Sequence, residues 1–154
     1  MSADRWDSIY TEGRHLLTNL LGIEVPVIRA VNGPATIHSE LAVLGDVNLA
    51  APKATFQDTH FQGAWCRVTA STWYGLCCWG RTTSFPAPGA AIDAEEALQI
   101  GLIGEIVASE ELLDRTRDIA RQFGAQQDVV RRYTRIILTR SLRTAELSLV
   151  MGYP

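Results

Sequence analysis

Near the start of the chain, hydrophobic and polar positions follow the order of a strand, a helix and a strand. Residues 25–31 (VPVIRAV) form an apolar, β-branched run that the turn signal at residues 32–34 (NGP) ends. Within residues 36–44, apolar side chains recur at helical spacing behind a polar start, which predicts a short helix. Residues 47–51 predict a second strand, and Thr55 begins a third extended segment. The pattern therefore predicts a βαβ-like unit.

The loop that leads into this short helix, residues 33–38, is a candidate site for chemistry. Backbone N–H groups at a helix N-terminus have no partner inside the helix and can hold an anion. The sequence places His38 and Glu40 at this loop, and His60 follows the next extended segment. A carboxylate and an imidazole on separate loops can share proton transfer to water and to carbon. The alternative is that Glu40 caps its helix or faces solvent while both histidines are ordinary loop residues.

Helices are predicted on both sides of this unit. Residues 4–23 have an apolar side and a stop at Gly22, and His15 among them is interpreted as an ordinary surface or packing histidine. Asp93 is the expected N-cap of a helix that ends at Gly101.

The last third of the chain predicts a short strand and two longer helices. The strand covers residues 103–107, and Ser109 is the expected cap of the first helix, which ends near Gly124. The second runs from about Asp128 to Met151 and has an apolar side and a basic side. We interpret the basic side as a solvated face rather than a phosphate-binding one, and the apolar side would need a partner chain. The basic side consists of Arg131, Arg132, Arg135, Arg140 and Arg143.

Four segments resemble motifs of the crotonase (enoyl-CoA hydratase/isomerase) superfamily. They are VPVIRAVNGPA (25–35), Ser39-Glu40-Leu41, GDVNLAAPKATF (45–56) and IDAEEALQIGLIGEIV (92–107). The resemblance implies an α/β fold with a crotonase-like ββα spiral core, incomplete at the N-terminus, and with C-terminal helices. Residues 1–107 would form the partial core and residues 108–154 the helical region.

The resemblance also implies roles for the candidate residues. Glu40 and His60 fall where hydratases of the superfamily keep two acid/base glutamates, and the histidine makes the chain more similar to the β-diketone hydrolases. In those, His60 would be a base or orienter for water, and His38 would contact the substrate carbonyl. The backbone N–H of Ile37 would be an oxyanion donor.

Substrate and partners follow from the same resemblance. It implies a small-molecule carbonyl substrate, either a cyclic diketone or an acyl-CoA, and no cofactor. Members of the family assemble through C-terminal helices, so a homo-oligomer, a trimer or a multiple of it, is expected. In the family, several strands precede the first helix and supply a second oxyanion donor. This chain starts at that helix, so that half of the site is expected to be absent.

Residues 64–90 do not share the pattern of the rest. Three of the four tryptophans and all three cysteines fall there, and no period of 2 or 3.6 is sustained. Ala64 to Thr69 can be encoded GCG TGG TGC CGG GTG ACG, which reads Val-Val-Pro-Gly-Asp from the third base. That hidden sequence resembles a Pro-Gly-Asp-Gly loop of the β-diketone hydrolases. We therefore hypothesise that this segment is translated out of frame.

An out-of-frame segment would remove a catalytic group. The family's aspartate that holds the histidine equivalent to His60 would be encoded across Val68 and Thr69, and neither is a carboxylate. A histidine without that partner loses control of its tautomer and stabilisation of its imidazolium. An unrelated cysteine site at Cys77-Cys78 is the alternative for the segment, but these adjacent cysteines have no paired histidine.

Composition excludes several classes of function. The chain has 154 residues, 14 basic against 17 acidic, which fits one domain and argues against nucleic acid as a partner. No apolar run is long enough for a membrane span, and the N-terminus is too polar for a secretion signal. The odd number of cysteines fits a reducing cytoplasm.

Three functions remain open on the sequence alone. The first is a hydrolase that cleaves a C–C bond of a cyclic β-diketone in a retro-Claisen reaction, impaired in this chain. The second is an enoyl-CoA hydratase or isomerase of the same fold. The third is a non-catalytic remnant or oligomer partner. We favour descent from a β-diketone hydrolase as the ancestry of the chain, and a non-catalytic role as its present state.

Overall fold

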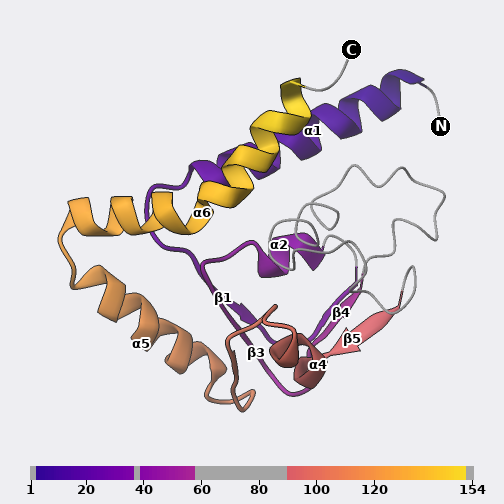
Figure 1. The fold of residues 1–154 in the computed structure, drawn as a ribbon. Coiled ribbons are helices and arrows are strands. Elements are labelled where there is room, and N and C mark those ends of the chain that lie inside the picture. Colours follow the sequence, from indigo (N-terminus) through magenta and orange to yellow (C-terminus); the bar gives the residue numbers. More distant parts are fainter. Residues whose placement is uncertain (1–2, 37–38, 58–89, 152–154) are drawn as a thin grey trace.

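The computed structural model describes residues 3–36, 39–57 and 90–151. Its described part is a mixed α/β arrangement of two small sheets with helices packed around them (Figure 1). The α/β class expected from the sequence is therefore confirmed.

The first sheet is parallel and has the strand order β1-β3-β6. β1 (Ile28–Val31) pairs with β3 (Val47–Ala50), and Ile28 lies opposite Val47. β6 (Glu105–Ile106) pairs with the other side of β3. The central strand β3 is buried from Asn48 to Ala50, as a parallel strand covered on both faces requires, whereas β1 is only partly buried and its Ala30 is exposed.

The second sheet has the order β2-β4-β5. β2 (Pro34–Ala35) pairs in parallel with β4 (Thr55–Gln57), and β5 (Ala91–Asp93) pairs with β4 in the antiparallel sense. Because β2 follows β1 and β4 follows β3 along the chain, each pass gives one strand to each sheet. This arrangement is the ββα spiral core that the resemblance implied.

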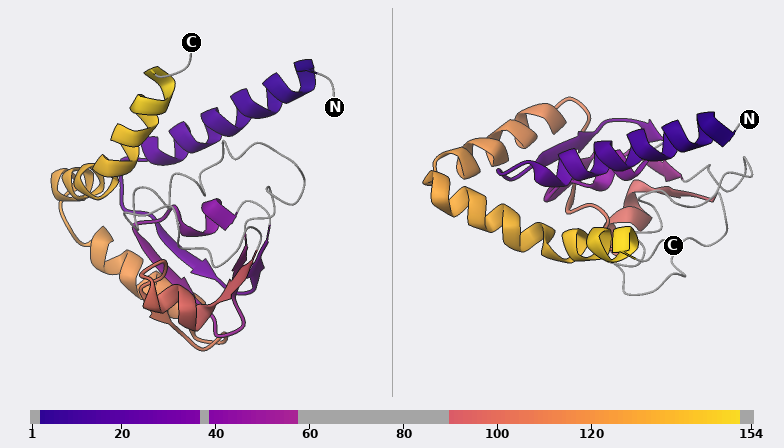
Figure 2. Two further views of the ribbon diagram at one scale, coloured as in Figure 1. Left: turned by 45° about the vertical axis from the view of Figure 1, so that its right-hand side comes forward. Right: turned by 90° about the horizontal axis from the view of Figure 1, so that it is seen from above.

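Five helices of the described part cover these sheets. α1 (Ala3–Gly22) and α6 (Asp128–Met151) lie side by side above the sheets in Figure 1, and Figure 2 shows the same pair from two more directions. α5 (Leu112–Gly124) packs on β1 and β3, while α2 (Ser39–Val43) and α4 (Ala94–Gln99) are short. The predicted bounds of α1 and α6 are confirmed to within one residue.

Two apolar clusters hold the layers together. The smaller lies between α5 and the first sheet, and Leu49, Ala51, Val107 and Leu112 are its buried members. The larger lies on the opposite face and joins α1, α2, α4 and both sheets; its most buried members include Ala50, Ala54, Phe56, Ile92 and Ala97. Burial of this apolar area is the main stabilising contribution to the fold.

A buried ion pair joins α6 to the core. The Arg135 guanidinium lies 2.5 Å from a carboxylate oxygen of Asp46, and the two side chains are 1% and 2% exposed. Arg135 also donates to the carbonyls of Leu20 and Ile23, and Asp46 accepts from the N–H of Val27 at 2.7 Å. The guanidinium therefore satisfies carbonyls at the end of α1, which the helix itself leaves unpaired.

The sequence predicted that the arginines of α6 form a solvated face, and this prediction is wrong for Arg135, which is buried. Arg143, two helical turns further along α6, donates to the carbonyl of Leu21 and to the hydroxyl of Thr139. Arg132, by contrast, forms an exposed ion pair with Glu24. The arginine positions that face α1 therefore bind its C-terminal carbonyls.

One further local prediction is wrong. Ser109 does not cap α5, which begins at Leu112 with Glu111 as the preceding residue and no side-chain cap. The turn signal at residues 32–34 does mark the end of β1 at Val31, and its last residue, Pro34, begins strand β2. Asp93, in contrast, is confirmed as the N-cap of α4, since its carboxylate accepts from the N–H of Glu96 at 2.9 Å. Gly101, with a φ of 74°, then ends the turn after α4, as predicted.

Candidate functional site

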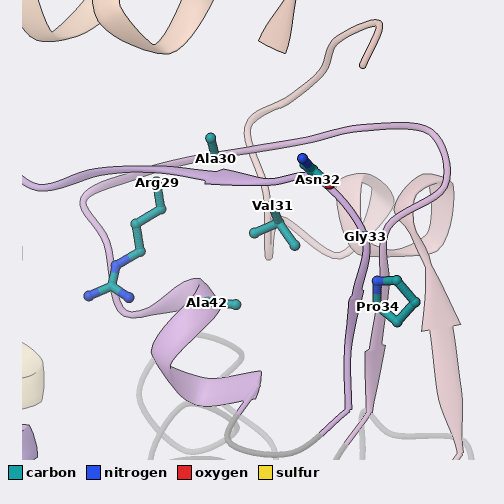
Figure 3. A pocket seen from close by; sticks show the side chains of 7 residues that line it. All are labelled: Arg29, Ala30, Val31, Asn32, Gly33, Pro34 and Ala42. Atoms are coloured by element: carbon teal, nitrogen blue, oxygen red, sulfur yellow. The ribbon is translucent and has the colours of Figure 1, made fainter. Parts of the chain in front are cut away.

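A cavity of about 470 Å³ lies alongside β1 and the loop that comes after it in the sequence (Figure 3). Its lining residues come from one continuous stretch, residues 29–34, and from Ala42 on α2. Arg29 and Val31 point toward α2 and Ala30 points away, as alternation along a strand requires (Figure 3). The cavity therefore lies between the first sheet and the short helix that carries Glu40.

A side-chain contact fixes the C-terminal end of this helix. Asn48, in the middle of β3, is buried and donates from Nδ2 to the carbonyl of Val43 at 2.8 Å. A methyl group at Gly45 would lie 2.5 Å from the side-chain oxygen of Asn48 and 2.9 Å from Cγ of Arg29. Because Gly45 has no side chain, the turn after α2 can approach Asn48 and Arg29 of the first sheet this closely.

Of the predicted site residues, one lies in a described element. Glu40 is the second residue of α2, and nothing is described of its side chain. Ile37, His38 and His60 lie outside the described residues. The segment 64–90, with the hypothesis of an altered reading frame, also lies outside them except for Ala90.

The strands that lead to the two histidines are described, however. β2 and β4 are adjacent and parallel, and Ala35 lies opposite Phe56. Parallel neighbours are about 4.8 Å apart and end at the same edge of a sheet. His38 follows the end of β2 by three residues, and His60 follows the end of β4 by three. Both segments therefore start from one edge of the second sheet.

The cavity residues were not among the sites that the sequence pattern suggested. Arg29 is the charged residue within an otherwise apolar strand, VPVIRAV, and it lines the cavity. A charge within an apolar strand was the available signal, since charged residues are depleted from the strands of parallel sheets.

The described residues offer neither a metal cluster nor a membrane span. Within residues 3–36, 39–57 and 90–151, no group of three or more His, Cys, Asp or Glu side chains could hold a metal ion. None of the described helices combines the length and the apolar character that crossing a bilayer requires.

Fold and cavity together define a protein of the crotonase class, with two sheets wound in a spiral and a cavity beside the first helix within it. The family model of enoyl-CoA hydratase/isomerase matches residues 3–149 of the sequence. The chain therefore belongs to the enoyl-CoA hydratase/isomerase family. The comparison with curated proteins gives no significant match.

Solved structures extend this assignment. A β-diketone hydrolase from Anabaena sp. PCC 7120, bound to (S)-3-oxocyclohexyl acetic acid, is 35% identical over 90% of this chain, with a TM-score of 0.81. An enoyl-CoA hydratase from Mycobacterium marinum is 26% identical over 81% of the chain, with a TM-score of 0.69. An enoyl-CoA hydratase/isomerase from Cupriavidus metallidurans CH34 shares the fold at a TM-score of 0.82 over 99% of the chain and 23% identity.

This chain is shorter than these relatives. It covers 57% of the Anabaena hydrolase, 59% of the Mycobacterium marinum hydratase and 62% of the Cupriavidus metallidurans protein. Whatever the whole proteins bind or catalyse is accordingly a proposal for this chain.

Proposed function

We propose that this chain derives from a hydrolase that cleaves a C–C bond in a cyclic β-diketone by a retro-Claisen reaction. The observation that carries the proposal is the 35% identity to a β-diketone hydrolase, against 20–26% to the hydratases and hydratase/isomerases with which it shares the fold. The bound ligand of that relative has a ring ketone and a carboxylate. Hydrolysis of a bicyclic 1,3-diketone leaves these two groups.

The proposed chemistry adds water across the bond that breaks. The oxygen of water bonds to one carbonyl carbon, and His60 takes the proton. The bond from that carbon to the carbon between the carbonyls then breaks, and its electron pair forms the enolate of the second ketone. Protonation of the enolate carbon gives the keto acid. His38 and the backbone N–H of Ile37 would hold the reacting carbonyl oxygen, and Glu40 would share the proton transfers.

The strand ends described above support this assignment of roles. His38 and His60 follow adjacent parallel strands that end at one edge, and Glu40 is the second residue of α2, the helix that contributes Ala42 to the cavity. Proton transfer between two such groups needs them within hydrogen-bond reach of the same substrate. The start from one edge is compatible with that requirement.

We propose that the activity is impaired in this chain. On the reading-frame hypothesis, the aspartate expected beside His60 would be encoded in the other frame across Val68 and Thr69, and the imidazole would be without that carboxylate. Loss of such a carboxylate leaves the geometry of a histidine site in place and lowers turnover by roughly 10⁴-fold in the best-known case. The expected residual rate is therefore small.

Turnover of one substrate tests the proposal. The purified chain is incubated with the bicyclic 1,3-diketone whose C–C hydrolysis gives 3-oxocyclohexyl acetic acid, and the keto acid is quantified by chromatography. We expect slow formation above the uncatalysed rate, which His60→Ala abolishes. His15→Ala, which changes an exposed histidine of α1, is the matched control and should leave the rate unchanged. Equal rates for the chain and for His60→Ala contradict catalysis by this residue.

A second function has its own supporting observation. The matching family model and several solved relatives are enoyl-CoA hydratases or isomerases. Hydration of an enoyl-CoA, detected as loss of its conjugated absorbance, would select this function over diketone cleavage. Inactivity of the chain toward both substrate classes would select the third, a non-catalytic remnant that takes part only in assembly.

We also propose that the chain forms a homo-oligomer, a trimer or a multiple of it, in the cytoplasm. The support for assembly is an apolar face on α6 that includes Ile137, which is 71% exposed. The odd number of cysteines supports a reducing compartment.

A further inference from the structure

Asn48 is a buried residue whose side-chain amide joins three parts of the fold. It lies in β3 opposite Arg29 of β1, and it is 8% exposed. Its Nδ2 donates to the carbonyl of Val43, at the end of α2, at 2.8 Å. In a longer contact of 3.4 Å, the same nitrogen donates to the carbonyl of Leu102, after α4. The backbone carbonyl of Asn48 accepts from the N–H of Gly104 at 2.8 Å, so α2, β3 and the turn after α4 meet at this residue.

Helix α2 depends on contacts outside itself for its position. It has five residues, which is too short for a helix to be stable alone, because nucleation of a helix is unfavourable. The carbonyls of its last turn have no partner within the helix. Asn48 donates to one of these carbonyls, and the side chains of Val43 and Leu44 pack in the larger apolar cluster. Contacts at the C-terminal end of α2 therefore determine where its first turn lies.

The side-chain oxygen of Asn48 offsets part of what the side-chain nitrogen contributes to stability. Oδ1 is buried and accepts no hydrogen bond from the described residues, and a buried acceptor of this kind lowers stability. An apolar side chain of similar size would fill the same space without an unsatisfied atom. The donor contacts, rather than packing, therefore explain a polar side chain at this point of the core.

We propose that Asn48 is a positioning residue, whose amide donor holds α2 where the first turn of this helix can take part in catalysis. Glu40 is the second residue of α2 and lies three residues before Val43, whose carbonyl the amide binds. The inference rests on the proposed hydrolase function, in which Glu40 shares the proton transfers. Asn48 does not touch the substrate and acts through the position of α2.

Amide hydrogen exchange tests the holding of α2 without reference to activity. Asn48→Asp keeps the shape of the side chain but replaces the donor with a carboxylate oxygen, which repels the two carbonyls. We expect the amide of Val43 to exchange about tenfold faster or more, and that of Ala51, which is bonded to the carbonyl of Val31 in β1, to keep its rate. Asn19→Asp, the same substitution at an exposed position of α1, is the matched control and should leave both rates unchanged.

Turnover of the bicyclic 1,3-diketone supplies the catalytic readout. In Asn48→Asp, we expect kcat to fall by about tenfold with little change in KM, because displaced reacting groups slow the chemical step more than they weaken binding. Asn48→Leu removes both the donor and the unsatisfied oxygen without adding a charge, and it covers the case in which the aspartate variant folds poorly. It should keep a urea midpoint close to that of the parent, yet lose the protection of Val43 and the same share of kcat.

Two results would overturn the proposal. One is exchange of the Val43 amide at the parent rate in both Asn48 variants. The other is an unchanged kcat in variants whose Val43 amide exchanges faster, which would give Asn48 a structural role alone. Failure of the proposed function has a different signature, because the parent chain would then not turn over the diketone. Faster exchange in both variants would in that case still support the holding of α2 by Asn48.

Discussion

Arg135 is the largest of the described side chains that are fully buried, and it shows how one charged residue is kept inside this fold. Its guanidinium is neutralised by Asp46 and donates to two carbonyls at the end of α1. An unpaired charge at such a depth would cost several kcal/mol. The pair therefore links α1, α6 and the turn before β3 through polar contacts in a site that excludes water.

Arg135→Met should destabilise the chain by about 3–5 kcal/mol, because it leaves Asp46 buried without its partner and removes the donors from two α1 carbonyls. Arg132→Ala is the matched control one turn earlier on α6. Its pair with Glu24 is exposed, so the loss should not exceed about 1 kcal/mol. Urea unfolding followed by far-UV circular dichroism measures both. Equal urea midpoints for the two variants would show that the buried ion pair contributes no more to stability than the exposed one.

Helix α6 buries a largely polar side against the rest of the chain and leaves its apolar side exposed, although the sequence pattern predicts burial of the apolar side. Its buried positions are Arg135, Thr139 and Leu142, whereas Ile137 is 71% exposed. The exposed apolar face, which we call the α6 face, consists of Val129, Val130, Tyr133, Ile136, Ile137 and Leu138. Most of these residues recur at the spacing of one helix side. A surface of this kind usually marks an interaction site.

Assembly through the α6 face predicts a clear effect of one substitution. Ile137→Glu places a charge in the middle of that face and should shift the chain from oligomer to monomer in sedimentation velocity. The monomer should keep its fold, because Ile137 makes little contact within the chain. Arg117→Glu, an exposed change on α5 that also introduces a glutamate, is the control and should leave the oligomer intact. A parent chain that is monomeric at all concentrations contradicts the expected assembly.

Sequence patterns predicted some of these elements and failed at others for physical reasons. α1, α4 and α6 were predictable because helical period, the Asp93 cap and glycine stops are local signals. β2 was missed because its two residues become a strand through pairing with β4, which is a tertiary contact. The buried position of Arg135 was missed because its partners, Asp46 and the α1 carbonyls, are about 90 residues or more away in sequence.

The candidate site divides in a similar way. His38, Glu40 and His60 could be proposed from residue type, loop position and family resemblance. Because β2 pairs in parallel with β4, the segments that lead to His38 and His60 start at the same edge of the second sheet. The cavity with Arg29 could not be proposed, since it depends on which face of β1 meets α2 and on the close approach permitted by Gly45. A sequence pattern gives the alternation of faces but not the element that covers each face.

At the scale of the whole molecule, the reading-frame hypothesis makes the last prediction. The family match covers residues 3–149, which include 64–90, yet that segment has a composition unlike the rest. We expect the gene to encode Ala64 to Thr69 with codons whose shifted frame reads Val-Val-Pro-Gly-Asp and stays open to about residue 90. A stop codon in that frame before Ile92, or codons that do not give Pro-Gly-Asp, would end the hypothesis. Where the frame is open, a repaired chain should carry a carboxylate beside His60 and turn over the bicyclic diketone faster than the present chain. Replacement of that new aspartate by asparagine should remove most of the gain, because a neutral amide neither fixes the imidazole tautomer nor stabilises the imidazolium.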